Sequence, residues 1–406
     1  ATNLLPDTVH MQTARRERVS INSDWRFHAD DPPGAGAKLL YDVLKPWLLP
    51  SANRFIKEPA RRHVRPEGHP GSDVDFVRTD FDDRSWQRVD LPHDWAIHGP
   101  FLTTGQYGGM GRLKTWGPVW YRRRLDIPAR DRAKSIFLDV DGAMSYATVW
   151  LNEKLVGGWP YGYASWRVDL TPHVVPGGVN QLVIRLDNPP ESARWYPGAG
   201  IYRNVWLTKV HRVHVAQWGT FVRTPHVAKE SATVELAVTI DNDSRTEQSV
   251  DVATVIHALD TDGRMIGRAA ARIPTSSARV AAGSSARVDG SATIANPRLW
   301  GPRPQQEPHR YLAVTTVSLG GKIIDRYETR FGIRSLELDP MHGVLVNGQR
   351  IPLNGVNNHH DLGALGAAFN YRAAERQLEV IQEMGGNALR MSHNPPAPEL
   401  LELADR

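Results

Sequence analysis

The chain has 406 residues, no cysteine, 13 tryptophans, and 49 basic against 44 acidic side chains, which gives a formal net charge of +5. This length predicts two to four domains, each large enough to bury its own core. The absence of cysteine excludes disulfides, thiolate metal sites and a cysteine nucleophile. The small positive excess is interspersed with acidic residues, which argues against a nucleic-acid partner.

The tryptophan content is the unusual feature of the composition. Flat indole faces suit stacking on sugar rings, so tryptophan clusters near polar groups indicate a carbohydrate ligand. No apolar stretch approaches the roughly 20 residues that span a bilayer, and we expect no membrane insertion. Residues 1–18 lack the apolar core of a secretory signal, so the sequence leaves the compartment open.

Residues 1–210 are predicted to form an all-β sandwich. Short runs rich in β-branched and aromatic residues recur between turn signals such as Asp141-Gly142 and Pro176-Gly177-Gly178. Residues 30–83 break this rhythm with proline, glycine, arginine and aspartate. We expect this stretch to be a surface excursion or insertion.

Residues 211–335 are predicted to form an immunoglobulin-like β-sandwich. Apolar and polar residues alternate cleanly from residue 213 onwards. About seven short strands fit within about 120 residues, which is the proportion of that fold. These strands carry no cluster of histidines or carboxylates, so we expect a spacer role.

Residues 336–406 are predicted to begin an α/β barrel, because the hydrophobic period changes from two to about 3.6. We expect strands at Ile351–Val356 and Asn387–Met391, a helix capped by Asn370, and a second helix that begins at Pro398. Two β/α repeats cannot cover their own apolar strand faces. The expected partner of this segment is therefore the remainder of the barrel, supplied by a continuation of the chain or by a separate chain.

Polar residues gather at the C-terminal ends of the two predicted barrel strands, where a β/α barrel assembles its active site. We expect them to contact the hydroxyls of one polar ligand. The histidines could also bind a metal, but their spacing defines no coordination geometry, and we expect no metal and no cofactor. The residues of this candidate site are His359, His360 and Asp361 after the first strand, and Arg390, His393 and Asn394 at the second.

A third group of candidate binding residues lies in the first sandwich, at Arg194, Trp195 and Tyr196. They occupy a loop bracketed by proline and glycine, where exposure to a ligand is expected. Tyr202 of the same segment, and Trp159 and Trp166 of a second aromatic cluster, are expected to pack loops onto the sandwich.

Five motifs recur in a characteristic order along nearly the whole chain. They are Leu91-Pro92-His93-Asp94-Trp95, Gly198-Ala199-Gly200-Ile201-Tyr202-Arg203, Phe331-Gly332-Ile333-Arg334, Gly355-Val356-Asn357-Asn358-His359, and Asn387-Ala388-Leu389-Arg390 with Ser392-His393-Asn394-Pro395. In this order they resemble glycoside hydrolase family 2, the group of β-galactosidases, β-glucuronidases and β-mannosidases. The resemblance implies a multidomain fold of a β jelly-roll sandwich that binds sugar, an immunoglobulin-like β-sandwich, and the start of a (β/α)8 TIM barrel.

The resemblance implies a role for each part of the candidate site. His359 and His393 would contact sugar hydroxyls, Arg390 would order the pocket floor and hold the nucleophile's carboxylate, and the loop of Arg194, Trp195 and Tyr196 would close the pocket. The stretch after His359 is similar to that of β-galactosidases from bacteria that degrade plant polysaccharides, which favours a β-galactoside. Sodium-binding β-galactosidases place an aspartate about where Arg194 stands, so no sodium ion is expected.

The family chemistry is retaining hydrolysis through two glutamates, an acid/base and a nucleophile. By the family pattern both are expected beyond Arg406, so no catalytic carboxylate is expected in this chain. The remaining glutamates near the site are expected on the solvated outer faces of helices. They are Glu375, Glu379, Glu383, Glu399 and Glu402.

Two alternatives stay open. The sugar could be a β-glucuronide or a β-mannoside, or the chain could be a non-catalytic carbohydrate-binding or structural protein that shares only the domain order. A periplasmic or secreted location fits polysaccharide use, and the sequence does not exclude a cytoplasmic one. The sequence also leaves open whether the protein is a homo-oligomer.

Overall fold

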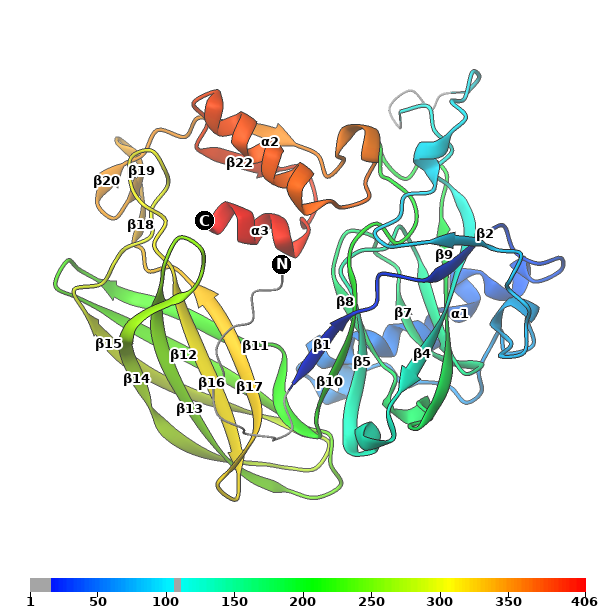
Figure 1. Ribbon diagram of the computed structural model, residues 1–406, viewed down its shortest axis with the longest axis horizontal. Coiled ribbons are helices and arrows are strands. Elements are labelled where there is room, and N and C mark those ends of the chain that lie inside the picture. The colour runs from blue at the N-terminus through cyan, green and yellow to red at the C-terminus, as the bar shows by residue number, and fades with distance from the viewer. Residues whose placement is uncertain (1–15, 106–110) are drawn as a thin grey trace, which may run out of the picture. The chain divides into compact units, whose positions relative to one another are not determined.

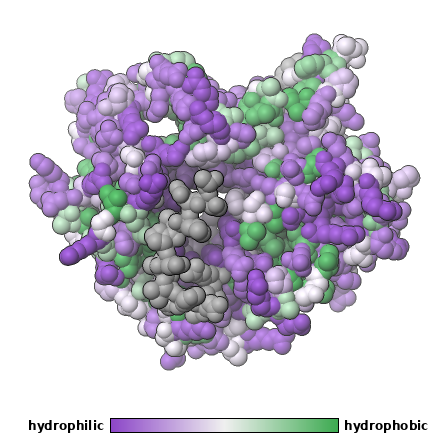
Figure 2. Space-filling model, viewed as in Figure 1, coloured by the Kyte–Doolittle hydropathy of each residue, from purple (hydrophilic) through white to green (hydrophobic). Residues whose placement is uncertain are grey.

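The computed structural model describes residues 16–105 and 111–406, which fall into two compact units. Among these residues, no helix combines the length and apolarity needed to cross a membrane. Hydrophilic residues dominate the face shown in Figure 2. The described residues of the jelly-roll unit are 18–105, 111–209, 302–304 and 351–406, and those of the immunoglobulin-like unit are 16–17, 210–301 and 305–350.

The jelly-roll unit contains a four-stranded and a six-stranded sheet (Figure 1). In sheet order, the smaller one comprises β1 (Glu17–Ser20), β10 (Val205–His211), β5 (Lys134–Val140) and β8 (Trp166–Asp169). The larger one comprises β3 (Gln87–Val89), β2 (Trp25–Ala29), β4 (Gly117–Ile127), β9 (Gly178–Asn188), β6 (Ala147–Leu151) and β7 (Lys154–Trp159).

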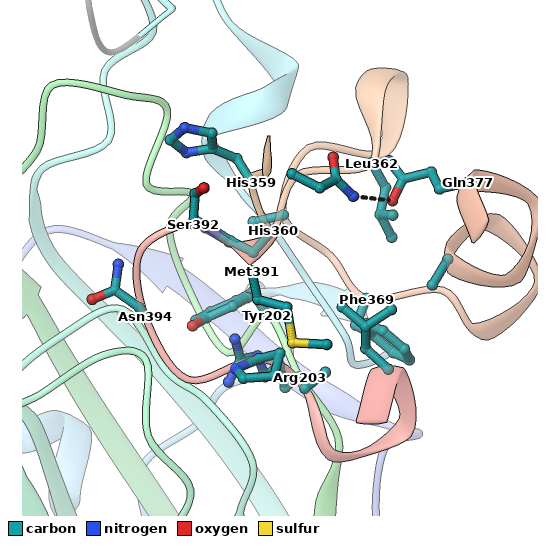
Figure 3. A pocket seen from close by; sticks show the side chains of 16 residues that line it. Tyr202, Arg203, His359, His360, Leu362, Phe369, Gln377, Met391, Ser392 and Asn394 are labelled. Atoms are coloured by element: carbon teal, nitrogen blue, oxygen red, sulfur yellow. Dashed lines mark hydrogen bonds between the residues drawn. The ribbon is translucent and has the colours of Figure 1, made fainter. Parts of the chain in front are cut away.

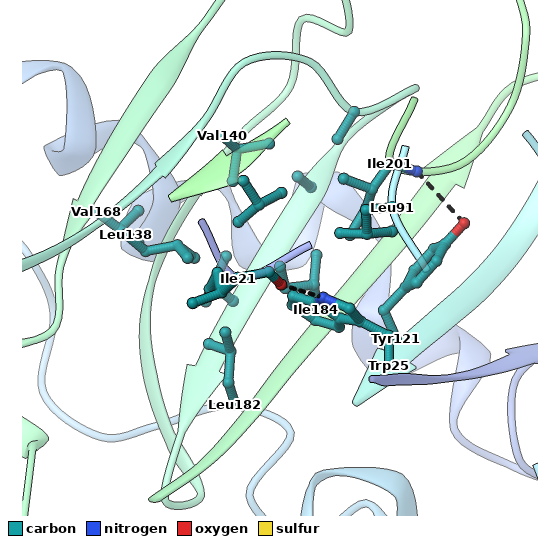
Figure 4. Close-up of a cluster of buried hydrophobic side chains, with 14 of the residues drawn as sticks. Ile21, Trp25, Leu91, Tyr121, Leu138, Val140, Val168, Leu182, Ile184 and Ile201 are labelled. Carbon is teal, nitrogen blue, oxygen red and sulfur yellow. Dashed lines mark hydrogen bonds between the residues drawn. The ribbon is translucent and has the colours of Figure 1, made fainter. Parts of the chain in front are cut away.

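Residues from both sheets form the main core of this unit (Figure 4). Successive side chains of a strand point to opposite faces, so Val119 and Tyr121 of β4 enter this core. Polar atoms inside it have partners: the indole N–H of Trp25 donates to the Ile21 carbonyl at 2.7 Å. The backbone N–H of Ile201 donates to the Tyr121 hydroxyl at 3.3 Å.

The stretch 30–83, expected as a surface excursion or insertion, is exposed or half-buried over most of its length. Part of it, however, packs on the outer face of the six-stranded sheet in a second core with Trp120 and Trp150. Buried ion pairs reinforce this layer, since Arg122 contacts Asp83 at 2.9 Å. Sequence reasoning did not predict this second core, because the residues of the layer have no regular hydrophobic period. Its elements are η1 (Gly36–Leu39), α1 (Tyr41–Leu48), η2 (Leu49–Phe55), η3 (Pro59–Arg61) and η4 (Asp75–Val77).

The immunoglobulin-like unit has the predicted sandwich, but its strands are 9 to 16 residues long rather than short. Alternate residues of these strands enter one core. In sheet order, the three-stranded sheet comprises β11 (Val213–Val227), β12 (Ser231–Asn242) and β15 (Ser284–Ala295). The four-stranded sheet comprises β14 (Met265–Val280), β13 (Gln248–Leu259), β16 (Tyr311–Leu319) and β17 (Lys322–Phe331), and a small third sheet comprises β18 (Leu336–Asp339), β19 (Gly343–Val346) and β20 (Gln349–Arg350).

Residues 351–406, the β/α segment, have the predicted strand–helix–strand–helix order. Strand β21 (Gly355–Asn358) pairs in parallel with β22 (Ala388–Met391), and helix α2 (Tyr371–Glu383) connects them. The side chain of Asn370 accepts a hydrogen bond from the Ala373 N–H, and Pro398 begins α3 (Pro398–Asp405), as predicted. The first strand, however, starts at Gly355 rather than at Ile351. The predicted fold class, two sandwiches followed by the start of a barrel, is confirmed.

Candidate functional site

The site is built at the C-terminal ends of β21 and β22. The parallel register pairs Asn358 with Met391, so the residues that follow each strand emerge side by side. The imidazoles of His359 and His393 consequently meet edge to face, with ring centroids 5.2 Å apart and planes at 90°. Two of the predicted binding residues are therefore neighbours.

Trp195, from the jelly-roll loop, joins these two histidines. Its ring centroid lies 5.5 Å from that of His359 and 5.3 Å from that of His393. The indole N–H donates to the hydroxyl of Tyr163 at 3.2 Å, which fixes the plane of the ring. We call Trp195, His359 and His393 the Trp–His–His cluster.

Two cations, Arg390 and Arg194, flank this cluster. The guanidinium of Arg390 donates to Ser392 Oγ at 3.2 Å and to Asn357 Oδ1 at 3.4 Å, and it makes no carboxylate ion pair with a residue that the structure describes. Desolvation, followed by the positive charges of Arg390, His359 and Arg194, lowers the pKa of His393. The His393 imidazole is therefore neutral at neutral pH and can both donate and accept a hydrogen bond.

Two buried polar atoms at the site have no hydrogen-bond partner among the described residues. They are Nδ1 of His359 and the amide nitrogen of Asn394, whose amide oxygen accepts from the Tyr161 hydroxyl at 2.5 Å. A buried polar atom without a partner costs free energy, so such atoms mark places where a polar ligand is favoured.

The other predicted residues lie around the cluster rather than in it. His360 turns away from His359, packs against Tyr163 and Tyr202, and contacts the Pro197 carbonyl through Nε2 at 2.9 Å. Burial lowers the pKa of His360 to about 4, so its ring is neutral and Nε2–H is the donor.

Tyr196 and Asp361 form the rear of the site. The Tyr196 hydroxyl donates to Asp94 Oδ2 at 2.6 Å, and burial, together with the nearby charges of Asp94 and Asp361, raises the pKa of Tyr196. The backbone carbonyl of Asp361 accepts from Gln377 at 3.3 Å. Arg194, one residue before Trp195, is exposed.

A small cavity lies beneath the site, lined by Tyr202, Arg203, His360, Phe369 and Leu400, among others (Figure 3). Its volume of about 30 Å³ is enough for a water molecule but not for a sugar ring.

Sequence reasoning missed the residues that hold the two parts of the site together. Arg203 is buried and its guanidinium donates to the Pro395 carbonyl at 2.9 Å and to the Tyr163 carbonyl at 2.7 Å. Asp94 is 2% exposed and accepts hydrogen bonds from both loops of the site. Asp94 and Arg203 both belong to motifs of the sequence analysis. A single sequence, however, does not show that their hydrogen-bond partners lie in distant loops.

The expectation of a solvated outer face is wrong for Glu399. Its Oε1 accepts from the side-chain amide of Asn204 at 2.5 Å, and its Oε2 is buried without a partner among the described residues. Helix α3 begins at Pro398, so Glu399 lies in its first turn and faces the jelly roll. Of the other four, Glu402 is exposed, and Glu375, Glu379 and Glu383 form ion pairs with arginines near the helix surfaces.

The fold and the site define a multidomain protein in which loops of a β-sandwich meet the strand ends of a β/α segment. Family models match the chain in three consecutive parts: the "Glycosyl hydrolase 2 galactose-binding domain-like" family at residues 90–220, "Glycosyl hydrolases family 2" at 213–334, and "Glycosyl hydrolases family 2, TIM barrel domain" at 340–406. Together they cover more than half of the chain. The chain therefore belongs to glycosyl hydrolase family 2.

Similar proteins agree with this assignment. The chain is 40% identical over 392 residues to the β-galactosidase BoGH2A of Bacteroides ovatus, a match that covers 96% of this chain and 40% of that protein. It is 26% identical over 352 residues to a β-glucuronidase of Formosa agariphila, covering 80% of this chain and 35% of that protein. A crystal structure of a family 2 member from Bacteroides cellulosilyticus matches with a TM-score of 0.78 at 27% identity, covering 96% of this chain and 44% of that one. The chain thus spans less than half the length of these relatives.

Proposed function

We propose that the polypeptide that carries this chain is a retaining exo-glycosidase that hydrolyses terminal β-galactosides of oligosaccharides or polysaccharides. The observation that carries the proposal is the convergence of Trp195, His359 and His393 in a member of a glycosidase family. An indole face suits the apolar face of a sugar ring, and imidazoles suit its hydroxyls. The choice of galactose is supported by the 40% identity to a protein named β-galactosidase.

In this proposal the residues of the chain bind and orient the sugar, and two carboxylates of the barrel perform the chemistry. A retaining glycosidase uses one carboxyl group as acid and then base, and the other as nucleophile. Neutral His393 would hydrogen-bond the sugar hydroxyls, and so would the imidazole of His359. Arg390, fixed by Ser392 and Asn357, has a guanidinium free to orient the carboxylate of the nucleophile.

A β-glucuronide is the second candidate. Arg194 and Arg390 both act on His393 electrostatically, and neither makes an ion pair with a carboxylate that the structure describes. A guanidinium is a good partner for the carboxylate of a hexuronic acid. Relatives named β-glucuronidase also match most of the chain. A β-mannoside is the third sugar to be tested.

The experiment is to express the complete polypeptide that carries these 406 residues and to measure kcat/KM on aryl β-galactoside, β-glucuronide and β-mannoside. We expect the highest value on the galactoside, with retention of anomeric configuration followed by NMR. A preference for the glucuronide or the mannoside would refute the choice of sugar. The 406-residue chain alone is expected to show no turnover, and turnover by it would overturn the assignment of catalysis to carboxylates outside it.

A further inference from the structure

Asp94 lies behind the site and its carboxylate is the meeting point of three backbone segments. Its Oδ1 accepts from the backbone N–H of Ala96 at 3.1 Å and of Ala199 at 3.2 Å. Its Oδ2 accepts from the Tyr196 hydroxyl at 2.6 Å and from the backbone N–H of Ala367 at 2.8 Å. The side chain has no salt-bridge cation within the described residues, so these four donors alone solvate it.

Three of these donors come from the two loops that carry the site. Tyr196 and Ala199 follow Trp195 in the jelly-roll loop, and Ala367 follows His359 in the β/α segment. The two loops touch again where Nε2 of His360 contacts the carbonyl of Pro197. A displacement of Tyr196 would therefore carry Trp195 with it, relative to the histidines.

Glycines permit this close approach. Gly198 has φ +72°, and a Cβ there would lie 2.3 Å from the Cβ of Ala367. Gly366 has φ +61°, and a Cβ there would lie 2.4 Å from Asp94 Oδ2. Neither position can accept a side chain without moving a loop away from Asp94.

We propose that Asp94 is a positioning residue that holds Trp195 over His359 and His393 and does not itself touch the sugar. This role rests on the proposed function: the buried carboxylate of Asp94 determines the shape of the sugar site in front of it. A shift of about 1 Å in a binding group can lower turnover about 100-fold, so the hydrogen bonds of Asp94 matter for activity beyond their contribution to stability.

The first experiment needs no activity. The complete polypeptide is labelled with 5-fluorotryptophan, and the ¹⁹F NMR resonance of Trp195 is assigned by its loss in Trp195→Phe. Asp94→Asn keeps the shape but replaces one acceptor oxygen by a donor, so it should shift or broaden the Trp195 resonance and leave that of remote, buried Trp150 unchanged. Tyr196→Phe, which removes a single hydrogen bond, should give a smaller change in the same resonance.

The control is Asp139→Asn, another buried aspartate of the same unit. Asp139 bonds to Arg167 and Thr208 on core strands and has no partner in either site loop. It should lower the melting temperature without moving the Trp195 resonance. If Asp94→Asn and Tyr196→Phe both leave the Trp195 resonance in place, the positioning role is overturned.

The second experiment uses kcat/KM of the complete polypeptide. Asp94→Asn is expected to lower it about 100-fold and Tyr196→Phe about 10-fold. The double variant should be no worse than Asp94→Asn, since the hydrogen bond that Tyr196→Phe removes is one of those that Asp94→Asn already disturbs. Multiplicative losses or an unchanged kcat/KM in Asp94→Asn would contradict the positioning role. A wild-type polypeptide inactive on all three glycosides would instead refute the proposed function, and the NMR result would still decide the role of Asp94.

Discussion

The ring centroids of Trp195 and His393 lie 5.3 Å apart, although one residue belongs to a sandwich loop and the other follows a barrel strand. His393 is exposed, so this contact lies at the surface of the protein rather than in a core. His393 can be removed without opening a cavity, so the roles of stability and binding can be separated at this position.

His393→Ala in the complete polypeptide is expected to lower kcat/KM for the preferred glycoside roughly 100-fold, the cost of losing one hydrogen bond that acts in the transition state. The melting temperature should change little, because the side chain is exposed. The control is His342→Ala, an exposed histidine of the other unit whose imidazole contacts Asp339. Equal kinetics for the two variants would refute a binding role for His393.

Gly198→Ala is expected to destabilise the jelly-roll unit by about 2–4 kcal/mol, from a strained φ and an overpacked contact with Ala367. Gly34→Ala is the matched control, because Gly34 has φ +78° and nothing within 4 Å of its added Cβ. It should cost only the strain, about 1 kcal/mol. Urea unfolding of both variants measures the difference, and equal losses would show that the loops do not approach as closely as described.

The raised pKa of Asp141 predicts that the stability of the protein depends on pH. Desolvation, in spite of a hydrogen bond from Trp206, raises the pKa of Asp141 from 3.8 to about 6. The folded state therefore binds the proton of the Asp141 carboxyl more tightly than the unfolded state. The contribution of this proton to the free energy of unfolding is complete below pH 4 and is lost as the pH rises to about 6. The loss is at most about 3 kcal/mol.

Asp141→Asn should remove this dependence. Its stability relative to the wild type should rise between pH 4 and pH 6 and then stay constant, as measured by urea unfolding at each pH. A difference that is flat across this range would show that Asp141 is ionised in the folded protein at pH 5.

His360 predicts a pH dependence of opposite sign. Burial lowers its pKa from 6.5 to about 4, so the folded state binds the proton more weakly than the unfolded state. The stabilisation is present above pH 6.5 and is lost as the pH falls towards 4, by at most about 3 kcal/mol. His360→Gln lacks this contribution, so its free energy of unfolding relative to that of the wild type should rise as the pH falls from 6.5 towards 4. Parallel pH profiles for the two proteins would contradict a neutral, buried His360.

Local rules of sequence were sufficient for the β/α segment. The Asn370 cap, the Pro398 helix start and the second strand depend on neighbouring residues, and all three occur as predicted. The rule that barrel sites form at strand ends was enough to place His359 and His393 in one site. The start of the first strand was wrong because hydrophobicity alone does not mark where hydrogen bonding to β22 begins.

The sequence by itself determined the order of domains, the kinds of elements and the polar strand ends, because each depends on periodicity or on chemistry close in the chain. Only the tertiary structure decided which of two adjacent histidines joins Trp195 and which turns towards Pro197, since neighbouring side chains in extended backbone point to opposite sides. It also decided the roles of Asp94 and Glu399. Whether a carboxylate is a surface group or a buried acceptor depends on the distant segments that pack against it. The residues next to it in the sequence do not determine that packing.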